Sequence, residues 1–146
     1  MMEEAKGVAN SETILILARV YDKLNMFKEA TEFYKKAIKE PKKKNINAYF
    51  FFAQMLEREK KFEDALSNYK LCMRHDKDNF GACLHLANLL SHLNEHQKAL
   101  KYFQHAYKLD AGSIAANYGL GKCMINSTGN YAGAVKFFKY VVDKDP

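Results

Sequence analysis

The sequence predicts an all-α protein in which four copies of one helix-turn-helix unit follow one another along the chain. A small residue followed four positions later by an aromatic residue recurs at spacings of 35, 34 and 35 residues. These pairs are Ala30 and Tyr34, Ala65 and Tyr69, Ala99 and Phe103, and Ala134 and Phe138. Within each copy, apolar residues are also three and four positions apart, the spacing of amphipathic helices. A period of this length is typical of stacked helix pairs, so we expect about eight antiparallel helices.

Each copy contains two expected helices separated by a polar turn. The four copies are predicted at residues 11–44, 46–79, 80–113 and 114–146. The turns are expected at KLNMF, REKKF, HLNEH and NSTGNY, where polar residues interrupt the apolar spacing. Residues 1–10 precede the first copy and are predicted to form a flexible tail. Residues 11–146 are therefore expected to form the helical domain.

A small residue in the first helix of every copy is expected to allow close packing. These positions are Ala18, Ala53, Ala87 and Gly121. A small side chain lets a neighbouring helix approach where a larger one would clash. The aromatic residue of the second helix is then expected to fill the space that remains.

The repeated positions resemble those of the tetratricopeptide repeat family, whose unit carries Leu-Gly or Leu-Ala, then Tyr, then Ala-x-x-x-Phe, then Pro. In the first copy the motif reads Leu17, Ala18, Tyr21, Ala30 and Tyr34. The resemblance covers about nine tenths of the chain. It implies a right-handed superhelical solenoid in which the first helix of each unit lines the concave side.

The chain departs from the family pattern at two positions of the repeat. The family's leading Trp is replaced by Ile14, Tyr49, Cys83 and Asn117. Its closing Pro is kept by Pro41, shifted by one residue, and by Pro146, which closes the fourth copy in register. Because arrays of this type need a polar capping helix, we expect the chain to belong to a longer array. The alternative is that the final helix, KFFKYVV, meets another subunit, including a second copy of the chain.

Composition and charge are those of a folded intracellular protein. Hydrophobic residues make up 48% and charged residues 27%, close to the averages for globular domains. The net charge of +6 mildly favours acidic protein partners, whereas Arg, the side chain best suited to phosphate, is scarce, so nucleic acid is not expected. The apolar runs ILILA and AYFFFA are too short to span a membrane. Three cysteines without a CxxC pair or an apolar signal segment predict a cytoplasmic location.

The motifs that could carry chemistry have simpler structural interpretations, so no enzyme, cofactor or metal site is predicted. Gly119 and Gly121 in GLGKC miss two positions of a phosphate-binding loop and are interpreted as packing positions. His92 and His96 fall in a predicted turn, without further zinc ligands at suitable spacing. Cys72 and Cys83 occupy packing positions of the repeat and are interpreted as small hydrophobes, and Cys123, on the first helix of the last copy, is not expected to be catalytic.

The surface formed by the first helices is the best candidate for a binding site. Counting from the repeat places four polar residues in one row: Arg19, Gln54, Asn88 and Lys122. An apolar row flanks it on one side: Leu15, Phe50, Leu84 and Tyr118. The other side carries Asp22, Glu57, Ser91 and Ile125. Such a groove suits an extended peptide, and the simpler alternative is a row that is polar because it faces water.

These observations predict a protein–protein interaction module that binds an extended peptide or a partner helix in its concave groove. One alternative is an assembly segment of a larger complex, of the ciliary-transport or cell-cycle type, that associates through its uncapped end. A second alternative, based on the excess of Lys, is an RNA-binding helical repeat.

Overall fold

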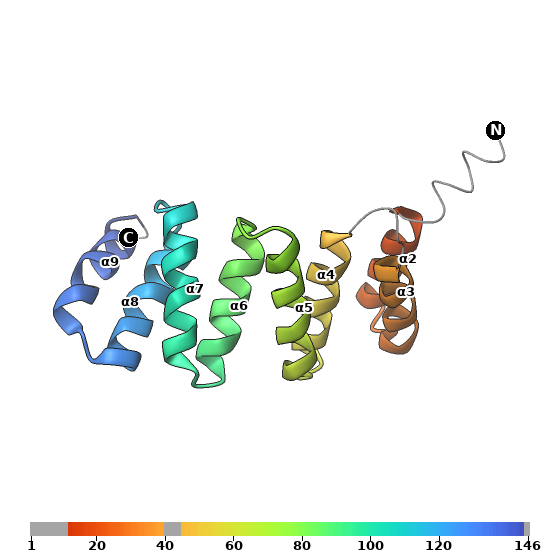
Figure 1. Cartoon of the computed structure of the whole chain (residues 1–146), viewed down its shortest axis with the longest axis horizontal. Coiled ribbons are helices and arrows are strands. Elements are labelled where there is room, and N and C mark those ends of the chain that lie inside the picture. The colour runs from red at the N-terminus through yellow and green to blue at the C-terminus, as the bar shows by residue number, and fades with distance from the viewer. Residues whose placement is uncertain (1–11, 40–44, 145–146) are drawn as a thin grey trace. The chain divides into compact units, whose positions relative to one another are not determined.

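The computed structural model describes residues 12–39 and 45–144, which form eight α-helices and no strand (Figure 1). The helices are α2 (Glu12–Lys23), α3 (Phe27–Lys39), α4 (Ile46–Arg58), α5 (Phe62–His75), α6 (Phe80–His92), α7 (His96–Leu109), α8 (Ile114–Thr128) and α9 (Tyr131–Lys144). The predicted all-α fold of helix pairs is confirmed. The predicted tail at residues 1–10, the link after Pro41 and the closing Pro146 lie outside the described residues.

The helices belong to two compact units. Unit 1 extends to Asp76 and contains α2 to α5, and unit 2 begins at Lys77 and contains α6 to α9. Each unit holds two antiparallel helix pairs (Figure 1). The division lies close to the expected boundary between the second and third copies of the repeat.

Each turn within a helix pair contains one residue in the left-handed backbone region. These residues are Asn25, Lys60, Asn94 and Gly129, with φ between 60° and 66°. In the second turn the N–H of Lys60 donates to the carbonyl of Glu57 at 3.0 Å, and the N–H of Lys61 donates to that of Leu56 at 2.8 Å. Equivalent bonds form around Asn25 and Asn94, and this Schellman arrangement satisfies carbonyls at the end of the first helix. Three turns therefore end their helices by the same mechanism.

The first helices of the last three pairs begin with the same type of cap. The side chains of Asn45, Asn79 and Ser113 accept a hydrogen bond from the backbone N–H three residues later, at 3.0 to 3.2 Å. This bond satisfies one of the N–H groups that a helix leaves unpaired at its start. The caps are 34 residues apart, so the helix starts follow the period of the sequence.

The repeated small and aromatic residues form the core, as the sequence predicts. Ala18, Ala53 and Ala87 are fully buried, and so are the small residues of the second helices, Ala30, Ala65 and Ala99. The aromatic residues Tyr34, Tyr69 and Phe103 are at most 1% exposed. In the last pair Phe137 is buried, whereas the predicted core residue Phe138 is half-buried.

The two glycines of GLGKC are required by packing, for different reasons. A Cβ at Gly121 would lie 3.1 Å from the Phe138 ring, which fills the space left by the missing side chain. A Cβ at Gly119 would lie within 2.7 Å of several atoms of the Phe103 ring. Earlier copies carry larger residues at the position of Gly119. This glycine is therefore required by its contact with Phe103 and not by the repeat pattern.

Unit 2 contains additional hydrogen bonds between its second helices and the segments that precede its first helices. The Tyr140 hydroxyl donates to the Gly112 carbonyl at 3.0 Å, and His105 Nε2 lies 2.9 Å from the Lys77 carbonyl oxygen. On the first helix α8 itself, the buried Asn117 donates to the carbonyls of Ala111 and Ser113, which provides partners for its amide. These bonds fix the segments that lead into α6 and α8.

The helix α8 is longer than the sequence pattern predicts. It continues through Thr128, and the left-handed residue Gly129 follows it. The predicted turn at NSTGNY therefore begins three residues too early, because its first three residues remain helical.

Candidate functional site

In unit 1 the polar row predicted on the first helices lies at the surface, and its cation stacks on an aromatic ring. Arg19 on α2 is exposed, and its guanidinium carbon lies 4.0 Å from the ring centroid of Phe51 on α4. A cation above an aromatic face is attracted by the ring's electrons. Gln54 on α4 is half-buried, as are Leu15 and Phe50 of the apolar row. Arg19 therefore links the two first helices of this unit.

Asp22, predicted at the edge of the groove, is buried with 8% of its surface exposed. Its Oδ2 accepts a hydrogen bond from the Tyr34 hydroxyl at 3.1 Å, and its Oδ1 pairs with the guanidinium of Arg58. Burial, followed by the charge of Asp22, raises the pKa of the Tyr34 phenol above its ordinary value. Through these bonds Asp22 connects α2, α3 and α4.

Glu57 repeats part of this arrangement in the second helix pair. Its Oε2 accepts a hydrogen bond from the buried Tyr69 hydroxyl at 3.0 Å. Burial, followed by the charge of Glu57, raises the pKa of Tyr69. The carboxylate is half-buried and joins α4 to α5.

In unit 2 four of the predicted groove residues, Asn88, Ser91, Tyr118 and Lys122, line one pocket of about 520 Å³, here called the first-helix pocket. Asn88 on α6 and both Tyr118 and Lys122 on α8 are exposed to it. The complete lining is Asn88, Ser91, His92, Asn94, His96, Phe103, Tyr118, Gly119, Lys122 and Asn126. The predicted residues Leu84 and Ile125 are half-buried and lie outside this lining.

The first-helix pocket combines amide, hydroxyl and cationic groups. Its lining contains no carboxylate. The amides of Asn88 and Asn126 can each donate and accept hydrogen bonds. The Lys122 ammonium lies 5.9 Å from the ring centroid of Tyr118, whose side chain is 50% exposed. Such a surface can bind the main chain of an extended peptide and attract an acidic side chain.

Several residues of this pocket were not predicted from the sequence. Asn126 lies one helical turn after Lys122, but it was assigned to a turn that the structure replaces with helix. His92 lies one turn after Asn88, at the end of α6, and His96 begins α7. Extending the polar row by four residues along each helix would have found Asn126 and His92.

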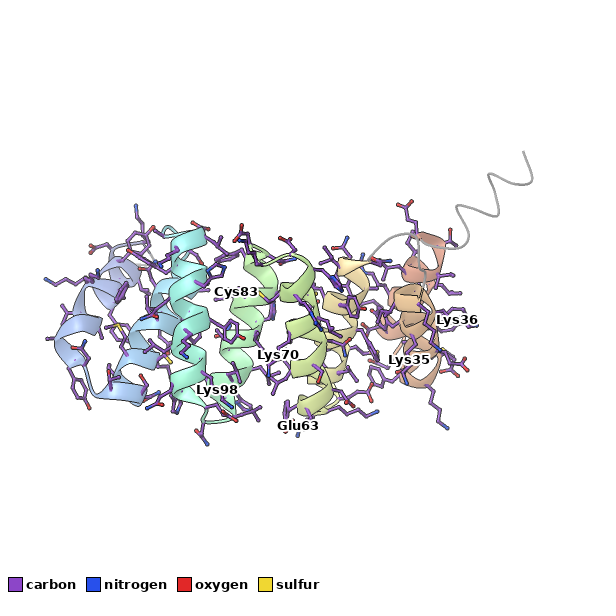
Figure 2. All side chains as sticks on the ribbon, in the orientation of Figure 1. Lys35, Lys36, Glu63, Lys70, Cys83 and Lys98 are labelled. Carbon is purple, nitrogen blue, oxygen red and sulfur yellow. The ribbon has the colours of Figure 1, made fainter. Side chains whose placement is uncertain are left out.

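The three cysteines are buried packing groups, as predicted for Cys72 and Cys83. Each thiol donates to a backbone carbonyl on a neighbouring helix, at 2.9 to 3.2 Å. Burial raises the pKa of Cys83, labelled on α6 in Figure 2, to about 11. Burial, with a smaller effect of Asp76, raises that of Cys72 to about 12. Buried thiols with raised pKa values are poor nucleophiles.

Within residues 12–39 and 45–144, no group of three or more His, Cys, Asp or Glu side chains is arranged to hold a metal ion. His92 ends α6 and His96 begins α7, so the two side chains lie on different helices and not in the predicted turn itself. None of the helices in the described part of the chain is long and apolar enough to cross a membrane.

The chain belongs to the tetratricopeptide repeat family. Two models of this family match residues 11–43 and 92–146, and together they cover more than half of the chain. Repeats of this family are protein–protein interaction scaffolds, and proteins built from them are typically not enzymes. The class of protein is therefore an interaction scaffold with protein partners.

The chain is also similar to individual proteins. The chain is 29% identical over 142 residues to the Protein CTR9 homolog of Arabidopsis thaliana, covering 94% of this chain and 13% of that relative. It thus spans only a small part of the relative's length. A crystal structure of MamA matches with a TM-score of 0.82 and 21% identity, covering 99% of this chain and 84% of MamA. A crystal structure of YrrB, described as a tetratricopeptide repeat protein with an unusual peptide-binding site, matches with a TM-score of 0.82. Its identity is 22%, over 97% of this chain and 74% of YrrB.

Proposed function

We propose that the chain binds an extended, acidic peptide segment of a partner protein in the first-helix pocket of unit 2. The observation that supports this proposal is the convergence of Asn88, Tyr118 and Lys122 on one pocket of about 520 Å³ whose lining has no carboxylate. The volume lies within the range of known ligand pockets.

The chemistry of the pocket favours an extended main chain. An extended peptide has unpaired N–H and C=O groups, and the amides of Asn88 and Asn126 can engage both types. The exposed ring of Tyr118 offers apolar surface to a side chain of the ligand. Lys122 supplies a positive charge that favours Asp or Glu at the neighbouring ligand position.

We propose that the first helices of unit 1 form, by themselves, a second surface for contacts of the same kind. On this surface Arg19 and Gln54 would supply polar groups, and Leu15 and Phe50 would supply apolar surface. In unit 2 the apolar surface of that unit's own first helices would be extended by Leu84. Asp22 and Glu57 would support this face indirectly, because their carboxylates already accept hydrogen bonds from buried tyrosines.

The proposal is tested by selecting peptides from a random displayed library and measuring their affinity for the whole chain by fluorescence anisotropy. The variant Asn88→Ala/Lys122→Ala is expected to bind the selected peptides with an affinity lower by about tenfold or more, since it lacks a hydrogen-bonding group and a charge. The peptides themselves are expected to be rich in Asp and Glu.

A matched control is Lys101→Ala/Lys139→Ala, which changes two exposed residues outside the first-helix pocket. It should leave affinity within about twofold, and circular dichroism should show equal helicity for both variants. Equal binding by the wild type and the Asn88/Lys122 variant would contradict the proposal.

A second candidate function, assembly through the last helix, is favoured by the exposed apolar face of α9. Tyr131, Val135 and Val142 are 69%, 49% and 67% exposed and lie on one side of the helix. Sedimentation velocity over a range of concentrations should then show self-association that Val135→Lys/Val142→Lys abolishes. A monomer at every concentration would remove self-assembly as a function.

A further inference from the structure

A second pocket of unit 2, here called the second-helix pocket, has a volume of about 580 Å³. It is lined by Gln104, Tyr107, Lys108, Leu120, Met124, Gly133, Lys136 and Phe137, from α7, α8 and α9. We propose that this pocket docks an amphipathic helix of a partner protein, with one large apolar side chain inserted and carboxylates beside it. This surface is separate from the peptide site proposed above.

The two pockets use opposite faces of α8. Leu120 and Met124 line the second-helix pocket, whereas Lys122 lines the first-helix pocket. Residues two apart on a helix point about 200° apart, so one ligand cannot contact both sets. The second-helix pocket can therefore bind a ligand while the first-helix pocket is occupied.

The floor of the second-helix pocket is apolar. Leu120 is 3% and Phe137 is 6% exposed, and the rings of Tyr107 and Phe137 meet edge to face with centroids 5.2 Å apart. Gly133 brings the backbone of α9 close to Met124, because a Cβ there would lie 2.7 Å from the Met124 methyl carbon. An apolar side chain entering this space would be removed from water.

The rim of the pocket is positively charged on two helices. Lys108 on α7 and Lys136 on α9 are both exposed, and the lining includes no carboxylate. The Lys136 ammonium lies 4.8 Å from the Phe137 ring centroid, directly beside the apolar floor. A ligand that places carboxylates next to its apolar anchor complements this arrangement, and a ligand with lysines there is repelled.

The second-helix pocket has fewer hydrogen-bonding groups than the first-helix pocket, which favours a helix over an extended segment as its ligand. Apart from Gln104, the Tyr107 hydroxyl and the two lysines, the lining side chains are apolar or absent. An extended peptide would lose water from its backbone groups without replacement, whereas a helix satisfies its own. Binding of an amphipathic helix between packed helices is a common recognition mode.

The test uses the whole chain and a fluorescein-labelled, alanine-based peptide of about 18 residues, long enough to be helical. The peptide carries one central Phe with Glu three and four positions to either side. The comparison peptide has Lys at those positions. We expect the Glu peptide to bind to the chain. The variant Lys108→Glu/Lys136→Glu should lower its affinity by about tenfold at low salt. The Lys peptide should bind at least about tenfold more weakly than the Glu peptide.

The control Lys101→Glu/Lys139→Glu makes the same change in net charge at exposed residues outside the second-helix pocket. It should leave the affinity within about threefold. NMR of the labelled chain should show shifts at the Gly133 amide and the Met124 methyl group on addition of the Glu peptide. Shifts at Lys122 instead, or equal binding of both peptides, would overturn the proposal. Binding of a uridine oligonucleotide at these lysines, without binding of the Glu peptide, would overturn it in favour of a phosphate ligand.

Discussion

The Tyr34 hydroxyl donates a hydrogen bond of 3.1 Å to the carboxylate of Asp22, twelve residues earlier on the other helix of the same pair. Glu57 and Tyr69 repeat this relationship at 3.0 Å, again twelve residues apart. At the same spacing in the third copy stand Ser91 and Phe103, which lack both the carboxylate and the phenol. The helix pairs therefore share one backbone arrangement, but they differ in the side-chain interactions between their two helices.

We predict that Tyr34→Phe destabilises the chain by about 1–2 kcal/mol, because it leaves the buried Asp22 carboxylate without one of its donors. The ring stacked on Phe52 at 5.4 Å is retained, so the lost hydroxyl is responsible. Urea unfolding followed by far-ultraviolet circular dichroism measures this loss.

The matched variant Asp22→Ser/Tyr34→Phe reproduces the pair found in the third copy. It should be more stable than the sum of the two single changes predicts, by at least about 1 kcal/mol. Strictly additive effects would show that Asp22 and Tyr34 act independently.

We predict that stability falls at alkaline pH. In the unfolded chain the thiols ionise near pH 8.5 and the phenols near pH 10, whereas the folded chain keeps these protons because its pKa values are raised. The unfolded state then binds fewer protons, so the free energy of unfolding falls by about 1.4 kcal/mol per pH unit for each buried tyrosine above pH 10. Below about pH 8 these groups should cause no change.

We predict that Gly119→Ala destabilises the chain by about 2 kcal/mol or more, because the new Cβ would overlap the Phe103 ring, which is 1% exposed. Gly121→Ala should cost less than about 1 kcal/mol. It meets the half-buried Phe138 ring, and alanine occupies the same repeat position in the three earlier copies. Urea midpoints compare the two variants, and equal losses would contradict this difference.

We predict that Lys60→Gly raises the free energy of unfolding by about 0.5–1 kcal/mol. Lys60 has a φ of 62°. This left-handed conformation has a higher free energy for lysine than for glycine or asparagine. The corresponding residues in the other turns are Asn25, Asn94 and Gly129. Thermal unfolding measures the gain, and Lys60→Val, with a branched side chain at the same φ, should lower stability instead.

The sequence was sufficient to predict the core because core positions recur. Four copies of one small-plus-aromatic spacing reveal both the helices and the faces that meet, and Ala30, Ala65 and Ala99 are buried accordingly. Features that occur in only one copy of the repeat were harder to predict. Phe137 is buried in place of Phe138 only in the last pair, and α8 passes through three polar residues before Gly129 ends it.

The candidate site could be predicted only in outline. Residue counting placed Asn88 and Lys122 on one surface, and both line the first-helix pocket. It could not show that Asp22 turns inward, because a carboxylate beside a surface row gives no indication of a tyrosine partner twelve residues away. Nor could it show the second-helix pocket, which depends on a single glycine, Gly133, and on the position of the Phe137 ring.

The caps at Asn45, Asn79 and Ser113 recur every 34 residues, and a left-handed residue ends the first helix within each interval. Each interval between caps thus carries its own start and stop signals, independent of its neighbours. A gene duplication or deletion whose ends fall at two caps would join segments that already contain the local instructions for folding. Arrays of this kind can therefore change in length by whole repeats, without any new signal having to arise at the junction.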